Sequence, residues 1–265
     1  MKVYDFEYDG VLLSDKGFII CKFDSSGVET VSNGSELTFN TVATLNGVRH
    51  ELTSVQYEDC LTTTFQICKH PCVYDSDEEI TLEEVRDMMR WLNRKGFHRF
   101  VLINDEYINT YFEASFNVSR IEVGGIIRGF EIEMFTNSPF AFQEPVELEI
   151  ENPIIDGKVL ILSKSDEEGY IYPKIDITVN LAGDLEIYND LDDRTMLIKN
   201  CQKGEVIHMN YPVITSSIAS HKIQNDFNWK FFRIARKYED NANYLTISLP
   251  CKMNIVYSPV IKIGV

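Results

Sequence analysis

The segment from Thr81 to Phe142 constrains the fold most, because it predicts one amphipathic helix followed by a series of strands. Thr81 and Glu84 have the spacing of a capping box, in which two side chains bind free backbone N–H groups of the first helical turn. Apolar residues then recur at helical spacing: Leu82, Val85, Met88, Met89 and Leu92. Basic residues and Gly96 follow, which suits the C-terminal end of a helix. We therefore expect a helix from Thr81 to about Lys95.

Three strands are expected after this helix. Phe100 to Ile103 is a short apolar run, and the stretches Tyr111–Val123 and Ile126–Phe135 each alternate apolar and polar residues, which is typical of strands with one buried face. The Gly124–Gly125 pair between the last two predicts a tight hairpin turn. Pro139 ends the unit, because proline has no N–H to donate to the interior of a sheet.

The residues before the helix also predict strands. Leu37–Leu45 and Val48–Tyr57 flank Asn46-Gly47, a pair that accepts the positive φ angles of a type I′ hairpin turn. Gly17–Phe23 is densely apolar, so we expect a strand that is buried on both faces. Cys60–Cys68 alternates and predicts a further strand.

A second unit is expected after Phe142. Gln143–Asn152, with prolines inside and just after it, is interpreted as a linker strand. Beyond it, short strands at regular spacing are separated by turn residues, which is the pattern of a β-sandwich or jelly roll. These strands are expected at Lys158–Leu162, Tyr172–Leu181, Leu185–Asn189, Arg194–Asn200, Val206–Tyr211, Trp229–Ile234, Tyr244–Leu249 and Met253–Tyr257. We therefore expect a mainly β domain with one helix at residues 1–142 and a β-sandwich at residues 143–265.

The charge of the chain limits its ligands. The net charge is −16 at pH 7, whereas DNA and anionic membranes are bound through clustered lysine and arginine. We therefore expect protein partners, no direct nucleic-acid binding and no membrane binding. No apolar run approaches the roughly 18 residues of a membrane-spanning helix, and Met1–Asp5 does not read as a secretion signal, so the chain is expected to stay in the cytosol where it is made.

The six cysteines are scattered along the chain, unlike a small disulfide framework. The densest group spans Cys68–Cys72 with His70 between the two thiols, and with Cys60 it could supply soft ligands for zinc. It lacks the paired Cys-x-x-Cys spacing usual in zinc sites, so free thiols are the favoured interpretation. We expect no metal and no cofactor.

The sequence contains no phosphate-binding glycine loop, no His-Glu-x-x-His and no Gly-x-Ser-x-Gly. Asp184 with Glu186, or the cluster Asp190–Asp193, could form the carboxylate pair of a glycosidase, and the cluster could also bind calcium. Acidic turns on a solvated surface explain these residues better. We therefore expect no catalytic residues.

Trp229 has two interpretations. Beside Phe231 and Phe232 it suits the core of a sandwich, which is the favoured interpretation. If it were exposed, its ring could contact a glycan or a partner protein.

A series of short motifs, taken together in their order, resembles the distal tail proteins of long-tailed bacteriophages, the Dit-like components of the tail-tip baseplate hub. The series begins with Phe6–Gly10 and Ser14–Ile19, continues with Arg90–Leu92 and Asp105–Tyr107, and ends with Gly129–Phe140. The motif residues of the hub domain are Trp91, Leu92, Gly96, Phe130 and Pro139. One departure is the segment Ser32–Glu36, where such proteins often carry a basic loop.

The resemblance implies a structural virion protein, not an enzyme. Residues 1–142 would form a β-sandwich-like or split-barrel-like domain. Six copies of it would make a ring at the tail tip, between the tail-tube protein and the tail-associated hub protein. Residues 143–265 would form a galectin-like β-sandwich at the periphery, where a receptor-binding protein could attach for host attachment. The ring would assemble in the host bacterial cytoplasm. DNA would pass through it, and an acidic wall would repel the duplex.

Two other functions remain open from the sequence. One is a monomeric carbohydrate-binding β-sandwich without catalysis, which an exposed Trp229 with neighbouring tyrosines would favour. The other is a hydrolase of cell-wall polymer, which two carboxylates converging in a cleft would favour. A particle of six times the 30.6 kDa chain mass is expected only for the ring.

Overall fold

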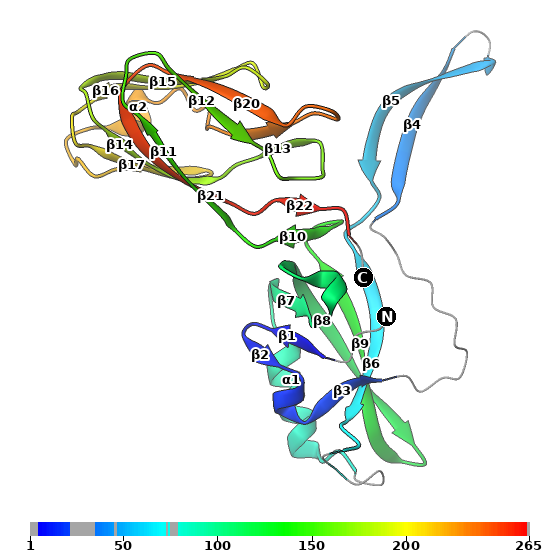
Figure 1. Ribbon diagram of the computed structural model, residues 1–265. Helices are drawn as coiled ribbons and strands as arrows, with labels where there is room; N and C mark the ends of the chain where they lie inside the picture. The colour runs from blue at the N-terminus through cyan, green and yellow to red at the C-terminus, as the bar shows by residue number, and fades with distance from the viewer. Residues whose placement is uncertain (1–4, 22–34, 45–46, 73, 75–78, 264–265) are drawn as a thin grey trace. The chain divides into compact units, whose positions relative to one another are not determined.

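The computed structural model of the protein describes residues 5–21, 35–44, 47–72, 74 and 79–263. The chain divides into two compact units, residues 1–142 with 262–265 and residues 143–261, and each is described by itself (Figure 1). The chain leaves the N-terminal unit through β10 (Ala141–Gln143) and returns through β22 (Val260–Ile261). Ile263 then packs against the N-terminal core. Both units are mainly β, as the sequence predicts.

The N-terminal unit is built on one sheet with the strand order β2-β1-β7-β8-β9-β6-β3. Its strands are β1 (Phe6–Tyr8), β2 (Val11–Leu12), β3 (Phe18–Cys21), β6 (Thr62–Lys69), β7 (His98–Leu102), β8 (Thr110–Val123) and β9 (Ile126–Thr136). Two short 3-10 helices, η1 (Ser14–Lys16) and η3 (Asp105–Tyr107), connect them. The core is rich in phenylalanine, and the helix α1 (Leu82–Leu92) contributes Met88 and Leu92 to it.

The start of α1 is the predicted capping box. The Thr81 hydroxyl accepts a hydrogen bond from the Glu84 backbone N–H at 3.3 Å, and the Glu84 carboxylate accepts one from the Thr81 N–H at 2.7 Å. The predicted end near Lys95 is wrong, because the helix ends at Leu92. Asn93 still donates to Met89 but turns out of the helix with ψ 78°, so Gly96, at φ +89°, lies in the following loop.

The predicted hairpin of β8 and β9 is confirmed. The strands pair from Ala114 with Thr136 to Val123 with Ile126. Gly124 and Gly125 have φ angles of +63° and +80°, which is the backbone that a two-residue type I′ turn requires. Because β9 also pairs with β6 from Gly129 to Phe135, this part of the strand lies inside the sheet.

The expected strand at Gly17–Phe23 is present as β3, but its burial on both faces is wrong. Phe18 is buried, whereas the next three residues are half-buried. The reason is its place in the sheet, since among the described strands β3 ends the strand order and pairs only with β6. Phe23 lies outside the described residues.

The second predicted hairpin is also present, with β4 (Leu37–Thr44) and β5 (Arg49–Tyr57) paired antiparallel from end to end (Figure 1). These two strands form a sheet of their own and join no other strand of the described chain. Gly47 has φ +83°, which suits the turn, and Asn46 lies outside the described residues.

The C-terminal unit is a sandwich of a five-stranded sheet, β11-β21-β14-β17-β18, and a four-stranded sheet, β12-β20-β15-β16. The five-stranded sheet contains β11 (Val146–Asn152), β14 (Lys174–Val179), β17 (Val206–Asn210), β18 (Val213–Ser216) and β21 (Cys251–Tyr257). The four-stranded sheet contains β12 (Gly157–Leu162), β15 (Gly183–Asn189), β16 (Arg194–Cys201) and β20 (Ala242–Ile247). β13 (Gly169–Ile171) and β19 (Ile234–Arg236) form a separate pair, and α2 (Ile223–Asp226) is one helical turn.

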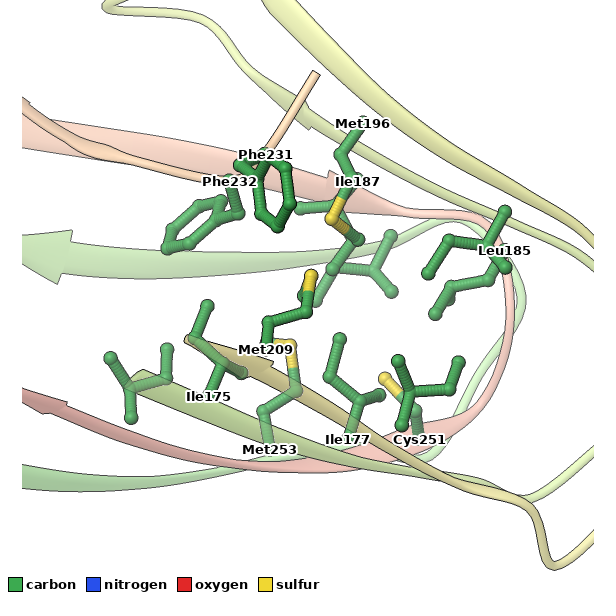
Figure 2. Close-up of a cluster of buried hydrophobic side chains, with 14 of the residues drawn as sticks. Ile175, Ile177, Leu185, Ile187, Met196, Met209, Phe231, Phe232, Cys251 and Met253 are labelled. Atoms are coloured by element: carbon green, nitrogen blue, oxygen red, sulfur yellow. The ribbon is translucent and has the colours of Figure 1, made fainter. Parts of the chain in front are cut away.

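Side chains from both sheets meet in one core (Figure 2). Ile175, Ile177 and Met209 reach it from the five-stranded sheet, and Leu185 and Ile187 reach it from the four-stranded sheet. This is the sandwich that the alternating sequence pattern predicts.

Two details of the second unit differ from the sequence predictions. β11 is not a linker, because it pairs with β21 along its whole length, from Val146 with Tyr257 to Asn152 with Cys251. The segment between the predicted strands Val206–Tyr211 and Trp229–Ile234, where no strand was expected, contains β18 and the turn α2. Its apolar residues are too few and too spread to produce a periodic signal.

Candidate assembly surface

The hairpin β4–β5, called the ribbon below, has one apolar face. Leu37 lies opposite Tyr57, Phe39 lies opposite Val55, and Leu52 follows on the same face. Side chains of directly opposed residues share a face of the sheet. Phe39 is 60% exposed and Leu52 is 56% exposed, so this face meets solvent in the isolated chain.

The opposite face of the ribbon is polar. It is made of four opposed pairs: Thr38 with Gln56, Asn40 with Ser54, Val42 with Glu51, and Thr44 with Arg49. Thr53 is an extra residue of β5 at a bulge, where the register of the two strands shifts. Beyond the bulge the residues pair again in order, so the apolar and polar faces stay separate along the ribbon. The ribbon is therefore amphipathic, with Val42 as an exposed apolar residue on its polar side.

The ribbon has no core within the described part of its own chain. At its base the Tyr57 ring packs against the Phe140 ring, with the ring centres 5.1 Å apart, and a 2.8 Å hydrogen bond from the Glu58 N–H to the Glu36 carbonyl closes the ribbon itself. An isolated two-stranded hairpin is marginally stable in water. A long exposed hairpin with an apolar face is the pattern of a segment that docks on another surface.

A second surface suited to assembly is the edge of β8 beyond its pairing with β7. The pairing of β7 with β8 ends at Ala114, so the outer edge of β8 from Asn117 to Val123 extends past β7. Backbone N–H and C=O groups on such an edge can pair with a strand of another chain.

The predicted motif residues of the hub domain support the N-terminal fold. Leu92 and Phe130 are fully buried, and the Trp91 ring stacks on Phe6 at 5.7 Å while its N–H donates to the Tyr8 carbonyl at 3.2 Å. Gly96 is exposed in the loop after α1, and Pro139 is half-buried after Ser138. Their role as a hub motif stays a prediction, and the surfaces above lie on other residues.

The interpretation of Trp229 as a core residue is wrong, because its side chain is 56% exposed. The strand expected at Trp229–Ile234 does not form, and Trp229 has a φ of +58°. The Asn228 side chain fixes this turn by accepting a hydrogen bond from the Lys230 N–H at 3.1 Å and donating to Thr195 at 3.0 Å. Phe227 and Phe231 occupy the core instead. Whether Trp229 contacts a glycan or a partner stays a prediction.

Four of the five carboxylates considered for catalysis hold turns together, and the fifth, Glu186, is exposed on β15. Asp184 accepts a hydrogen bond from the Asn200 N–H at 2.9 Å, Asp190 accepts one from the Tyr244 N–H at 3.0 Å, and Asp193 accepts one from the Tyr188 hydroxyl at 3.2 Å. Asp192 forms a bidentate pair with Arg233. These bonds give each of the four carboxylates a structural function.

The cysteine and histidine cluster does not assemble into a metal site. Among the described residues, no three His, Cys, Asp or Glu side chains are placed to hold an ion. Cys68 instead lies beside Cys21 of the neighbouring strand β3, where the hydrogen bond between the thiols and burial raise the pKa of Cys21. Burial raises the pKa of Cys201 to about 12 and that of Cys251 to about 11, so these thiols stay protonated and unreactive.

One titratable pair is fully buried in the C-terminal unit. The Glu205 carboxylate contacts Nδ1 of His221 at 2.5 Å and also accepts hydrogen bonds from Ser216 and the Gln202 N–H. Burial alone would raise the pKa of Glu205, but these hydrogen bonds outweigh it and hold the pKa below its ordinary value. The pair joins the turn before β17 to the segment after β18, which is a structural role.

Comparison with known families identifies the chain. A family described as phage tail protein N-terminal domain matches residues 1–138, and one described as phage tail C-terminal domain matches residues 140–257. The chain is a member of this phage tail protein family. The resemblance to tail proteins seen in the motifs is therefore confirmed.

The fold of this tail protein is that of a distal tail protein. The crystal structure of the SPP1 Dit protein, described as a paradigm of the hub adsorption apparatus in phages that infect Gram-positive bacteria, superposes with a TM-score of 0.64 and 11% sequence identity. The match covers 97% of this chain and 99% of the SPP1 chain. No curated protein sequence matches the tail protein. No helix in the described part of the chain has the length and apolar character of a membrane span.

Proposed function

We propose that this tail protein forms a ring of six copies at the distal end of the tail, and that its ribbon joins neighbouring copies. The exposed apolar face of β4–β5 is the observation that carries this proposal, because the described part of the chain provides no surface to cover it. The full-length likeness to a Dit protein described as a hub supports the same function.

A second copy is the occupant that symmetry favours. Each chain carries one ribbon, and a head-to-tail contact between two different surfaces closes into a ring when the rotation between copies permits it. Closure then covers every ribbon once and leaves no apolar edge exposed. The number six rests on the resemblance to distal tail proteins.

The ring would join the tail-tube protein on one side to the tail-associated hub protein on the other. A receptor-binding protein would attach through the C-terminal unit, whose galectin-like character stays a prediction. The ring would assemble in the host cytoplasm and end at the virion tail tip. DNA would pass through it without direct binding, since the net charge of −16 repels phosphate. The protein would act by assembly, without catalysis, a metal or a cofactor.

The mass of purified variants tests the proposal. Leu52→Asp places a charge on the apolar face, and Val42→Asp places the same charge on the polar face at a site that is 54% exposed, close to the 56% of Leu52. Wild type and Val42→Asp are expected to give particles of six chains in light scattering, with ring shapes in electron micrographs. Leu52→Asp is expected to give monomers, because burying an unpaired carboxylate is costly.

The ring could close only in contact with the tail-tube protein, so the same measurements are repeated on mixtures of each variant with tail-tube protein. If wild type stays monomeric both alone and with tail-tube protein, the ring is contradicted. If Leu52→Asp and Val42→Asp assemble equally well, the ribbon does not join the copies.

A further inference from the structure

The outer face of the five-stranded sheet in the C-terminal unit carries one polar side chain from each strand, in a single row. Glu149 lies opposite Asn254, Asn254 lies opposite Asp176, Asp176 lies opposite His208, and His208 lies opposite Thr215. Directly opposed residues in an antiparallel sheet place their side chains about 5 Å apart on the same face. The five side chains therefore form a continuous line across the whole sheet.

Four of these five residues line a groove with a volume of about 310 Å³. It contains Asp176, His208, Thr215 and Asn254 and is bordered by Lys174 and Val213. Its size lies at the lower end of small-ligand sites, so it fits a ligand of one or two rings better than a protein partner, whose contact area would be much larger.

The central pair of the row is held in place. Nδ1 of His208 lies 2.6 Å from a carboxylate oxygen of Asp176, which fixes the orientation of the ring. Nε2 of His208 then remains for a ligand, and both side chains are about half exposed, at 52% and 58%. The pair thus offers a positioned nitrogen and a free carboxylate oxygen without being buried.

The charges of the groove favour a neutral ligand. Lys174 would repel a cation, and Asp176 would repel an anion, so neither kind of ion is preferred. The groove also provides donors and acceptors together, since Asn254 and Thr215 each carry both. A compound rich in hydroxyl groups, which donate and accept at once, satisfies such a mixture.

Apolar surface lies next to this polar row. Val213, which lines the groove, is 57% exposed, and Tyr211, which follows the groove residue Asn210 in the turn before β18, is 53% exposed. The C–H face of a sugar ring packs on such apolar and aromatic surface while its hydroxyls form hydrogen bonds.

We infer that this groove on the outer face of β14, β17, β18 and β21 binds a neutral saccharide. The site lies in the C-terminal unit, uses residues other than the ribbon and adds sugar recognition to the proposed assembly function. Its central residues are Asp176 and His208, with Asn254 and Lys174 beside them.

Binding of a disaccharide panel to the full-length protein tests the inference. The probes are neutral disaccharides of glucose, galactose and N-acetylglucosamine at up to 10 mM, followed by saturation-transfer NMR and calorimetry. At least one is expected to bind wild type. Asp176→Ala and His208→Ala are each expected to weaken it by about tenfold or more, the effect of about 1.4 kcal/mol from lost polar contacts. Tyr211→Ala is expected to have a smaller effect.

Tyr244→Ala is the matched control, because Tyr244 is 54% exposed on the other sheet, in β20. It is expected to bind as wild type does. Failure of every neutral disaccharide to bind, equal binding by wild type and Asp176→Ala, or binding of glycerol phosphate in place of neutral sugars would overturn the inference. Leu52→Asp separates it from the assembly proposal, because a chain that no longer assembles is expected to bind the sugar unchanged.

Discussion

The two long hairpins of the N-terminal unit share an alternation of apolar residues but have opposite surroundings. In β8–β9, the alternate apolar residues Phe112, Phe116, Phe130, Ile132 and Met134 are all buried in the core. In β4–β5, the alternate apolar residues Leu37, Phe39, Leu52 and Val55 are all exposed. One hairpin has strands and a helix packed around it, and the other has no neighbouring strand in the described chain.

This difference separates folding from assembly. Apolar burial provides most of the free energy of folding, so β8–β9 belongs to the structure that must form first in each chain. The ribbon adds little to the stability of one chain and leaves its apolar area exposed, where the proposed assembly would cover it. The same kind of alternation in sequence can therefore serve either purpose.

The largest expected difference concerns truncation of a phenylalanine in each hairpin. Phe130→Ala is expected to lower the free energy of unfolding by about 3–5 kcal/mol, because it leaves a cavity in the core. Phe39→Ala is expected to change it by less than about 0.5 kcal/mol, because the side chain is already exposed. Chemical denaturation under conditions that keep both variants monomeric measures the two values, and equal losses would mean that the ribbon belongs to the core.

A smaller effect is expected from the cap of α1, which packs on the sheet that contains β8–β9. Burial would raise the pKa of Glu84, but hydrogen bonds from Thr81 and Lys69 outweigh it and lower the pKa from its ordinary value of 4.5. The carboxylate therefore stabilises the fold above about pH 4.5, and this contribution is lost as the pH falls through the lowered value. Glu84→Gln is expected to cost about 1 kcal/mol at pH 7.

Thermal unfolding at pH 7 and pH 3 measures this contribution. The difference between wild type and Glu84→Gln is expected to shrink as the pH falls from 7 to 3, because the carboxylate takes up its proton as the pH passes through its lowered pKa. Thr38→Ala on the polar face of the ribbon is the control and is expected to show no such change with pH. An undiminished difference at pH 3 would mean that the charge of Glu84 is not the cause.

An effect of the same size as that of the cap, or smaller, is expected at the two turns. Gly125 in β8–β9 and Gly47 in β4–β5 have nearly equal φ angles, +80° and +83°, and nothing lies within 4 Å of an added Cβ at either. Gly125→Ala is expected to lower the unfolding free energy by about 1 kcal/mol, because alanine resists positive φ. Gly47→Ala is expected to leave global unfolding unchanged and to weaken assembly. Equal effects on unfolding would contradict the separation of the two hairpins.

Local sequence rules predicted much of this fold. The capping box at Thr81, the Gly124–Gly125 turn and the alternation of β8 and β9 each depend on residues close in sequence. The sandwich core followed from strand alternation in the same way. These signals are strong because the chemistry that specifies each element lies within it.

Features that depend on tertiary neighbours could not be predicted. Only the pairing with β21 shows β11 to be part of the sandwich, and only the turn fixed by Asn228 shows why Trp229 faces solvent. The polar row from Glu149 to Thr215 joins five strands that are far apart in sequence, so no local pattern reveals it. The ribbon was visible as a hairpin, but its lack of a core appears only when the rest of the sheet is known.

Hydrogen–deuterium exchange at several protein concentrations tests the central claim most directly. At low concentration, amides of β4–β5 are expected to exchange quickly, while those of β8–β9 stay protected by the core. As concentration rises, the amides of β4–β5 are expected to become protected in parallel with the appearance of the six-chain particle. Fast exchange of β4–β5 inside an assembled particle, or protection that does not change with concentration, would contradict the account.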